Sequence, residues 1–226
     1  MFLVKPSFRV LEIMGGTMDM LGAVSGPLEL IERAGRTCYK SEERMTEDSA
    51  EKFVRMVRER GHESVLEHSA MTVKLVVDRG VSHELVRHRL CAFSQESTRY
   101  CNYKGGVTFV IPPWVNVEPG DYKFQSYPTG LRDSACITWM NSLWSSEIDY
   151  CVLLSRGWSP QQARSVLPNS LKTEIVVTAN FREWRHIFTL RTSKAAHPQM
   201  REIMIPLLQW ATDAIPVMFE DIVVEK

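Results

Sequence analysis

An excess of charge of either sign is missing from this sequence. Its 226 residues include 27 Lys plus Arg and 27 Asp plus Glu, so the formal net charge at pH 7 is +0 with neutral His. Proteins that hold DNA or RNA do so mainly by neutralising phosphates, which requires a surplus of basic groups. A nucleic-acid partner is therefore not expected, and local clusters of basic residues are expected to bind small anions.

Long hydrophobic runs are absent as well. Nowhere does the sequence keep the apolar stretch of about 18 residues that a membrane-spanning helix needs. The first apolar run contains Lys5 and Pro6, and no cleavage-site pattern of a secretory signal follows it. We expect a cytoplasmic protein with no membrane partner.

The sequence also lacks the spacings that mark common metal, redox and dinucleotide sites. His83 and His88 are five positions apart and His62 and His68 are six apart, so neither pair forms the i, i+4 clamp of a helical zinc site, and no metal is predicted. Residues 15–22 do not match G-x-G-x-x-G, so side chains must hold any nucleotide cofactor. The cysteines are odd in number and scattered, which predicts reduced, mostly buried thiols. They are Cys38, Cys91, Cys101, Cys136 and Cys151.

The remaining composition is typical of a globular protein, with 44% hydrophobic and 24% charged residues. The length favours a single domain over residues 1–226. Alternating and helical spacings of apolar residues occur in turn along the chain, which predicts an α+β protein with a mixed sheet. Strands are expected near residues 8–14, 70–77, 107–113 and 173–179, and helices near 47–60, 81–88, 133–156, 160–164, 181–191 and 199–219.

Capping residues and breakers set several of these boundaries. Thr46 is predicted to cap the helix that Gly61 ends, and Asn180 is predicted to cap the helix over 181–191. Ser159 and Pro160 fit the N-cap and first position of a helix, while residues 15–27 read as a loop. Pro206 and Pro216 are expected to bend or interrupt the last helix. The expected buried face of the helix over 133–156 consists of Ile137, Met140, Trp144, Ile148 and Cys151.

One stretch combines cations with a hydroxyl at fixed spacing. In RHRLCAFSQESTRY, residues 87–100, Arg87, His88 and Arg89 stand in a row and Ser97 follows after seven intervening residues. A solvated charged surface has no use for a hydroxyl at a set distance. The planar guanidinium fork matches phosphate oxygens, so the stretch indicates an anionic ligand.

This R-H-R-x7-S pattern resembles the signature of the flavin-dependent thymidylate synthases, the ThyX family. Three further segments resemble family segments in the same order along the chain: GHESVLEH at 61–68, ARSVLP at 163–168 and NFREWRHIFTLR at 180–191. ERAGRTCYKS at 32–41 fits less specifically. The resemblance implies a single ThyX-like catalytic domain with a largely antiparallel sheet packed with helices.

The resemblance also implies an activity. The family consists of methyltransferases that convert dUMP to dTMP, using 5,10-methylenetetrahydrofolate as one-carbon donor and FAD, reduced by NADPH, as hydride source. It further implies a homotetramer in which each active site draws on more than one subunit. The expected partners are accordingly dUMP, folate and NADPH.

Roles are carried over residue by residue from the resemblance. Arg191 would act in catalysis, beside the uracil ring, where it would stabilise negative charge as the pyrimidine is activated at N3. The flavin-binding set is Ser64, Arg87, His88, Arg89, Gln95, Asn180, Arg182 and His186. The substrate-binding set is Glu84, Leu85, Val86, Arg87, Gln95, Glu96, Ser97, Thr98, Arg99, Arg164 and Arg191, with Arg99 and Arg164 on the phosphate. Glu84, Gln95 and His186 depart from residues found in some family members, so their individual hydrogen bonds can differ here.

Other interpretations of the same residues remain. Arg182, Arg185 and Arg191 could pair with acidic residues, Glu174 and Glu183, on a solvated helix face. The basic loop could also belong to a noncatalytic nucleotide- or RNA-binding module. Trp184, Ile187 and Phe188 are interpreted as core residues, without a role in the site. Cys91 lies inside the motif and could be interpreted as a nucleophile, but the ThyX mechanism as usually proposed needs no protein thiolate.

Overall fold

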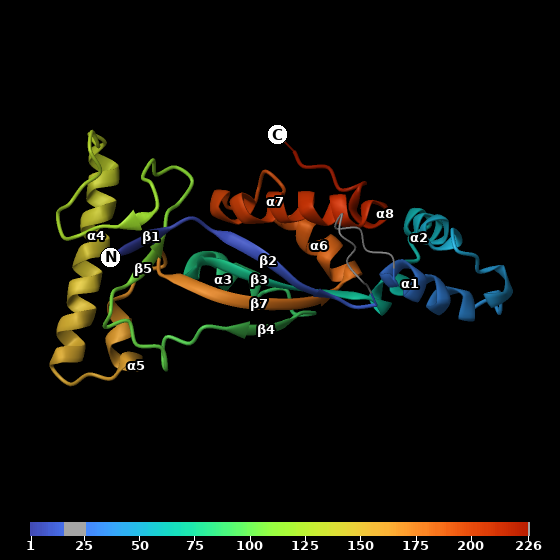
Figure 1. Ribbon diagram of the computed structural model, residues 1–226, viewed down its shortest axis with the longest axis horizontal. Helices are drawn as coiled ribbons and strands as arrows, with labels where there is room; N and C mark the ends of the chain where they lie inside the picture. Colours follow the sequence, from blue (N-terminus) through green and yellow to red (C-terminus); the bar gives the residue numbers. More distant parts are fainter. Residues whose placement is uncertain (16–25, 226) are drawn as a thin grey trace. The chain divides into compact units, whose positions relative to one another are not determined.

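The computed structural model describes residues 1–15 and 26–225. The strands are β1 (Phe2–Val4), β2 (Ser7–Ile13), β3 (Ala70–Asp78), β4 (Ala92–Gln95), β5 (Thr108–Val110), β6 (Gly120–Asp121) and β7 (Lys172–Asn180). The α-helices are α1 (Gly26–Thr37), α2 (Ser49–Glu59), α3 (Arg79–Leu85), α4 (Ser134–Ser155), α5 (Pro160–Ala163), α6 (Phe181–Arg191), α7 (Pro198–Ala214) and α8 (Pro216–Phe219). Short 3-10 turns, η1 (Glu42–Arg44), η2 (Glu63–His68) and η3 (Arg164–Val166), connect some of them. Figure 1 labels the helices and most strands.

The chain divides into two compact units, each made of three stretches. Unit 1 consists of Met1–Ser7, Leu75–Arg87 and Ser94–Ile175. Unit 2 consists of Phe8–Lys74, His88–Phe93 and Val176–Lys226, of which residues 16–25 and 226 are outside the described part.

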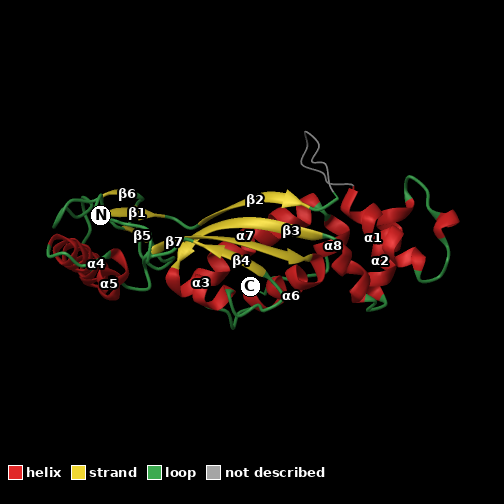
Figure 2. Cartoon of the chain, turned by 90° about the horizontal axis from the view of Figure 1, so that it is seen from below, coloured by secondary structure: helices red, strands yellow, loops and turns green. Residues whose placement is uncertain are grey.

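A four-stranded sheet in the order β2-β3-β7-β4 contains the two longest strands (Figure 2). Along β3 the side chains of Met71, Val73, Leu75 and Val77 are buried, as the predicted alternation requires. β7 shows the same alternation between buried and half-buried positions. These two strands, predicted at 70–77 and 173–179, are confirmed almost to the residue.

A second sheet, in the order β5-β1-β6, lies with α4 in unit 1. β1 pairs in parallel with β5 and antiparallel with β6. The predicted strand near 107–113 is β5, whereas β1 and β6 were not predicted because runs of three and two residues show no periodicity. The core of this unit contains Leu3, Phe109, Met140 and Trp144.

α4 confirms its predicted span but corrects its predicted face. Asp133 caps it, accepting a hydrogen bond of 2.8 Å from the Ala135 N–H, and Gly157 ends it with φ +90°. Ile148, predicted to be buried, is 43% exposed, while Tyr150 is fully buried. Apolar residues lie on several sides of this helix, so their spacing alone could not predict which side faces the core.

The helices of unit 2 position the C-terminal motif. Asn180 caps α6 as predicted, accepting a hydrogen bond of 2.8 Å from the Glu183 N–H. Trp184 and Phe188 are fully buried, and the Trp184 indole donates to the Met71 carbonyl at 2.9 Å. α7 packs on α6 (Figure 1), and the predicted interruption before Pro216 separates α7 from α8.

Several local predictions were wrong. Thr46 does not cap α2, which begins at Ser49 with Asp48 at the N-cap position; the Ser49 hydroxyl instead accepts a hydrogen bond of 2.9 Å from the Thr46 N–H. α3 ends at Leu85, so Arg87 and His88 follow it instead of lying on it. The predicted loop over 15–27 falls largely outside the described residues. All five cysteines are free as expected, but only Cys136 is buried.

Candidate active site

In unit 1, the segment 95–99 starts at the last residue of β4. Residues of neighbouring strands and helices bind several of its side chains. The Gln95 amide donates hydrogen bonds to the Ser82 hydroxyl at 2.9 Å and to the Thr173 hydroxyl at 3.2 Å. These two bonds use both hydrogens of Nε2. The side-chain carbonyl oxygen of Gln95 is the polar atom that they do not use.

Glu96 is the centre of a polar network. The Tyr103 hydroxyl donates to Oε1 at 2.8 Å, and the Lys172 ammonium donates to Oε2 at 3.0 Å and to Glu174 at 2.8 Å. Burial, followed by the bond to Glu96, raises the pKa of Tyr103 well above its usual value. Burial lowers the pKa of Lys172, but its hydrogen bonds to Glu174 and Glu96 outweigh this, so the net pKa is raised. Tyr103 is therefore neutral and Lys172 is charged at neutral pH.

The cations assigned to phosphate lie at the same segment. Arg164 follows α5, which begins with Ser159 at the N-cap and Pro160 at the first position as predicted, and its Nη1 donates to the buried Thr98 hydroxyl at 3.0 Å. Arg99 is exposed, and its backbone N–H donates to the Ser97 hydroxyl at 3.3 Å. Thr98 thus ties Arg164 to the predicted substrate loop.

The other predicted substrate residues of unit 1 lie at the C-terminal end of α3 and directly after it. Glu84 and the buried Leu85 lie in its last turn, and Val86 and Arg87 follow it as exposed residues. The Arg87 N–H donates to the Glu84 carbonyl at 3.2 Å, which closes the turn.

In unit 2, His88 joins the R-H-R motif to α6. Its Nδ1 lies 3.3 Å from Oε1 of Glu183, and its Nε2 accepts a hydrogen bond of 2.9 Å from Nε of Arg191. His186 meets the same ring edge to face, with ring centroids 5.7 Å apart. Burial, followed by the charges of Arg191 and His186, lowers the pKa of His88 to about 4, so His88 is neutral at pH 7.

The same three groups, His88, Glu183 and His186, bring potential metal-ligand atoms within 4.8 Å of one another. Both ring nitrogens of His88 already face protein partners, Glu183 and Arg191. A hydrogen-bonded unit describes this arrangement better than an open set of ligands.

The predicted flavin residues of α6 line a pocket of about 600 Å³ in unit 2. Asn180, Arg182 and His186 contribute to its wall together with Leu90. Arg182 pairs with Glu67 at 2.6 Å and with Glu63 at 3.2 Å. Arg89 is exposed and does not line this pocket.

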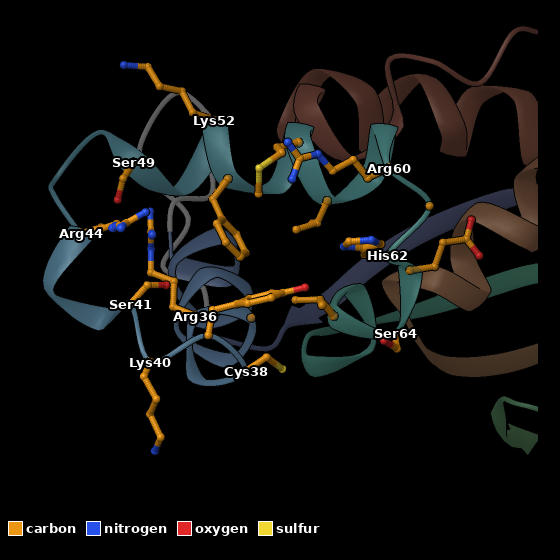
Figure 3. A pocket seen from close by; sticks show the side chains of 18 of the residues that line it. Arg36, Cys38, Lys40, Ser41, Arg44, Ser49, Lys52, Arg60, His62 and Ser64 are labelled. Carbon is orange, nitrogen blue, oxygen red and sulfur yellow. The ribbon is translucent and has the colours of Figure 1, made fainter.

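A second, larger pocket of about 1140 Å³ lies among α1, α2 and η2 of the same unit. Ser64 and Arg182 line it, so Arg182 belongs to both pockets. Its other basic residues are Arg36, Lys40, Arg44, Lys52, Arg60 and His62. In Figure 3, Lys40 and Lys52 point away from the cavity, whereas Arg60 and His62 lie on its opposite side from Arg36 and Arg44.

Comparisons with known proteins identify the family. A family profile described as thymidylate synthase complementing protein matches residues 19–217. A flavin-dependent thymidylate synthase from Mycobacteroides abscessus is 37% identical over 203 residues, covering 88% of this chain and 80% of that protein. One from Mycobacterium tuberculosis is 34% identical over 206 residues with the same coverages of 88% and 80%. The chain belongs to the flavin-dependent thymidylate synthase family. The predicted enzyme class and flavin cofactor are thereby confirmed, and the noncatalytic alternative is not favoured.

Solved structures support the fold. The UMP/dUMP methylase PolB from Streptomyces cacaoi, bound with 5-Br dUMP, has a TM-score of 0.76 at 23% identity and covers 97% of this chain and 96% of that one. Thymidylate synthase X from Helicobacter pylori, solved with FAD and dUMP, has a TM-score of 0.74 at 22% identity and covers 97% and 100%. The predicted α+β, ThyX-like fold is confirmed. Among the described residues, no helix is long and apolar enough to cross a membrane.

Two alternative interpretations can be compared with the structure. The thiol of Cys91 is poorly suited to be a nucleophile, because burial, followed by the charge of Glu183, raises its pKa to about 12. Arg182 and Arg185 do form ion pairs, but their partners are Glu63 and Glu67 for the first and Asp221 for the second. These partners lie far away in sequence, which is why helix spacing did not find them.

Sequence reasoning missed some residues of the larger pocket and of the network around Glu96. Arg36, Arg44 and Arg60 line the larger pocket, and Lys172 and Tyr103 hold Glu96. The segment ERAGRTCYKS was a signal for the first group, since it contains Arg36 and resembles a family segment. No local pattern pointed to Lys172, which is brought to Glu96 by the contact between distant segments.

Proposed function

We propose that the protein converts dUMP to dTMP by reductive methylation, with 5,10-methylenetetrahydrofolate as one-carbon donor and NADPH as reductant of bound FAD. Family membership supports this activity. The structural observation that supports it most directly is the hydrogen bond between Arg191 and His88. It connects the catalytic candidate of the C-terminal motif with the R-H-R motif, as a working site would require.

The residues present fit a dinucleotide flavin. FAD carries a negatively charged pyrophosphate, and the larger pocket is lined by Arg36, Arg44, Arg60 and Arg182. We propose that Ser64, Arg87, His88, Arg89, Gln95, Asn180, Arg182 and His186 hold FAD. When bound, FAD supplies hydride for the reduction. The arginines of the pocket would neutralise the charge of the pyrophosphate and donate directional hydrogen bonds to its oxygens.

The substrate would be held by the segment that unit 1 positions. We propose that Arg99 and Arg164 bind the phosphate of dUMP, and that 84–87 and 95–97 border the nucleoside. The Thr98 hydroxyl and the Glu96 network fix the backbone of this segment, so the binding groups are ordered before the substrate arrives.

The role proposed for Arg191 is electrostatic. Negative charge develops on the pyrimidine as it is activated at N3, and a guanidinium group beside the ring stabilises that charge more strongly as it grows. Arg191 is half-buried, and its Nε is fixed by His88, so little reorganisation is needed when the charge forms.

We also propose that residues 1–226 act as one catalytic domain and assemble as a cytoplasmic homotetramer with shared active sites. The two compact units each carry part of the predicted set, with the phosphate cations in unit 1 and Arg191 in unit 2. Such a distribution is compatible with sites that use more than one copy of the chain.

The proposal is tested in two measurements. The purified protein, incubated with FAD and desalted, should show flavin absorbance bands. With dUMP, methylenetetrahydrofolate and NADPH it should form dTMP, and omission of any one of these should stop the reaction. A protein that binds dUMP but forms no dTMP with flavin bound would support the noncatalytic binding module instead.

A further inference from the structure

Glu183, His88 and Arg191 form a continuous row of polar side chains in unit 2. His88 stands between the other two, with Nδ1 3.3 Å from the Glu183 carboxylate and Nε2 2.9 Å from Nε of Arg191. The side chains of His88 and Glu183 are 4% and 8% exposed. Two of the three residues are therefore shielded from water, where a hydrogen-bond partner matters most.

Glu183 and Arg191 lie on the same helix, at its two ends. They are eight positions apart on α6, which corresponds to roughly 12 Å along the axis. Over this distance the two side chains do not contact each other directly along the helix. The imidazole of His88 spans the distance, since its two nitrogens point in different directions.

Donor and acceptor roles in this row follow from chemistry. A guanidinium group only donates, so Nε2 of His88 must be the acceptor, and the single proton of the neutral ring must be on Nδ1. The Nδ1–H then faces Glu183, whose carboxylate only accepts. With the opposite tautomer, an N–H on Nε2 would face the N–H of Arg191, and an unprotonated Nδ1 would face a carboxylate.

Further titratable groups near His88 include His186 from α6 and, on its own segment, Cys91, whose backbone N–H donates to the His88 carbonyl at 3.3 Å, and the flanking exposed Arg87 and Arg89. Cys91 remains a thiol, since its pKa is about 12. The lowered pKa of His88 agrees with a neutral ring. Glu183 is the one negative group among these neighbours, and it faces Nδ1.

We propose that Glu183 is a positioning residue of the thymidylate synthase reaction, which fixes His88 in the Nδ1–H tautomer so that Nε2 holds Arg191 by its Nε. The inference rests on the proposed role of Arg191. The bond to Nε sets the plane of the guanidinium group and thereby the direction of its terminal Nη1–Nη2 edge, the edge that this bond does not use. Glu183 acts through His88 and does not itself touch the substrate.

Replacing the carboxylate by an amide is the informative change. In Glu183→Gln the side chain keeps its size but can offer an N–H to Nδ1, which permits the opposite tautomer and sets two donors against each other at Arg191. Glu183→Asp keeps an acceptor of the same charge. We expect Glu183→Gln to lower kcat by at least about tenfold with a much smaller change in the KM for dUMP, because a wrong tautomer leaves binding intact but misorients the catalytic group. Glu183→Asp should recover most of that loss.

A matched control excludes a general effect of removing an acid from the first turn of a helix. Glu51 lies in the first turn of α2, is exposed and pairs with Arg55. Glu51→Gln should leave kcat unchanged. Thermal unfolding of each variant shows whether it is folded.

A direct readout does not require turnover. Nitrogen-15 NMR of histidine-labelled wild-type protein, without substrates, should show His88 protonated at Nδ1 and unprotonated at Nε2, with the signals assigned by their loss in His88→Gln. Protonation at Nε2 in the wild type would overturn the inference even if dTMP is formed. So would wild-type kcat in Glu183→Gln. If no variant or wild-type protein forms dTMP, the proposed function fails, while the NMR experiment still decides the tautomer. If Glu183→Gln does not fold, Glu183→Asp and the wild-type tautomer carry the test.

Discussion

The hydroxyl of Tyr103 donates a hydrogen bond of 2.8 Å to the Glu96 carboxylate, seven residues earlier in the chain. This bond closes the segment that contains the proposed phosphate ligand Arg99. Lys172 holds the other oxygen of the same carboxylate at 3.0 Å. The proposed dUMP loop is thus fixed by side chains outside the sequence motif.

Tyr103→Phe should therefore raise the KM for dUMP several-fold with a smaller effect on kcat. The variant keeps the ring but removes a hydrogen bond that is worth on the order of 1–3 kcal/mol when its acceptor is charged. Steady-state kinetics with varied dUMP measures this. Tyr122→Phe is the control, because it removes a tyrosine hydrogen bond to the Glu118 carbonyl in the same unit. Equal effects of the two changes would mean that the loop does not depend on Tyr103.

Arg191→Ala should reduce the maximal rate of dTMP formation more than it weakens dUMP binding. The proposed contact strengthens as charge develops on the ring, so its loss raises the barrier more than it destabilises the bound substrate. Comparison of kcat with the dUMP dissociation constant separates the two effects. Arg191→Lys keeps the charge but loses the planar fork and should lie between alanine and wild type. A variant with weak binding and an undiminished kcat would contradict the role.

Cys91→Ser should retain substantial turnover. The thiol has a pKa of about 12, so almost none of it is thiolate at pH 7, and no step assigned to the protein requires one. The measurement is dTMP formation by the folded, flavin-loaded variant. Complete loss of activity in such a protein would restore Cys91 as a nucleophile.

Stability should fall as the pH is lowered from about 6.5 towards 4. Within this window the unfolded chain takes up a proton at His88, whose ordinary pKa is 6.5, whereas the folded chain does not, because burial and then the charges of Arg191 and His186 lower its pKa to about 4. The contribution of this residue is at most on the order of 3 kcal/mol of unfolding free energy. Denaturant unfolding across this range should show a shallower pH dependence for His88→Gln. An unchanged slope would mean that other groups cause the loss.

Co-expression of Arg87→Ala and Arg191→Ala should restore a measurable fraction of activity, if each variant alone is inactive. In a tetramer whose sites take these two arginines from different chains, some mixed sites receive both wild-type residues. Size measurement and differential tags verify the mixed assemblies. Verified mixed tetramers without activity would place both arginines of one site on the same chain, and a monomer would refute the shared site.

The sequence predicted the elements whose signals are local. β3 was predicted by alternation, β7 was also predicted as a strand, and Asn180 was found as a cap because the capping hydrogen bond joins residues three positions apart. The motif residues were identified by resemblance, and His88 and Arg191 prove to be in contact. The assignment of individual residues to flavin or substrate stays a prediction.

What could not be predicted depends on contacts between distant segments. Ile148 was placed in the core and Tyr150 was not, because α4 has apolar residues on several sides and its buried side is selected by a cluster that draws on distant segments, among them Leu3 and Phe109. The link from Glu183 through His88 to Arg191 joins residues 95 and 103 positions apart. Helical periodicity contains no information at that range.

The division of the chain falls inside its most informative motif. Arg87 ends one stretch of unit 1, and His88 begins a stretch of unit 2. Each unit is assembled from three separate stretches, so no single cut releases either as a continuous fragment. Neither unit can therefore be expressed by itself as one uninterrupted stretch of the gene, because removal of the other unit requires internal deletions as well as the loss of one end.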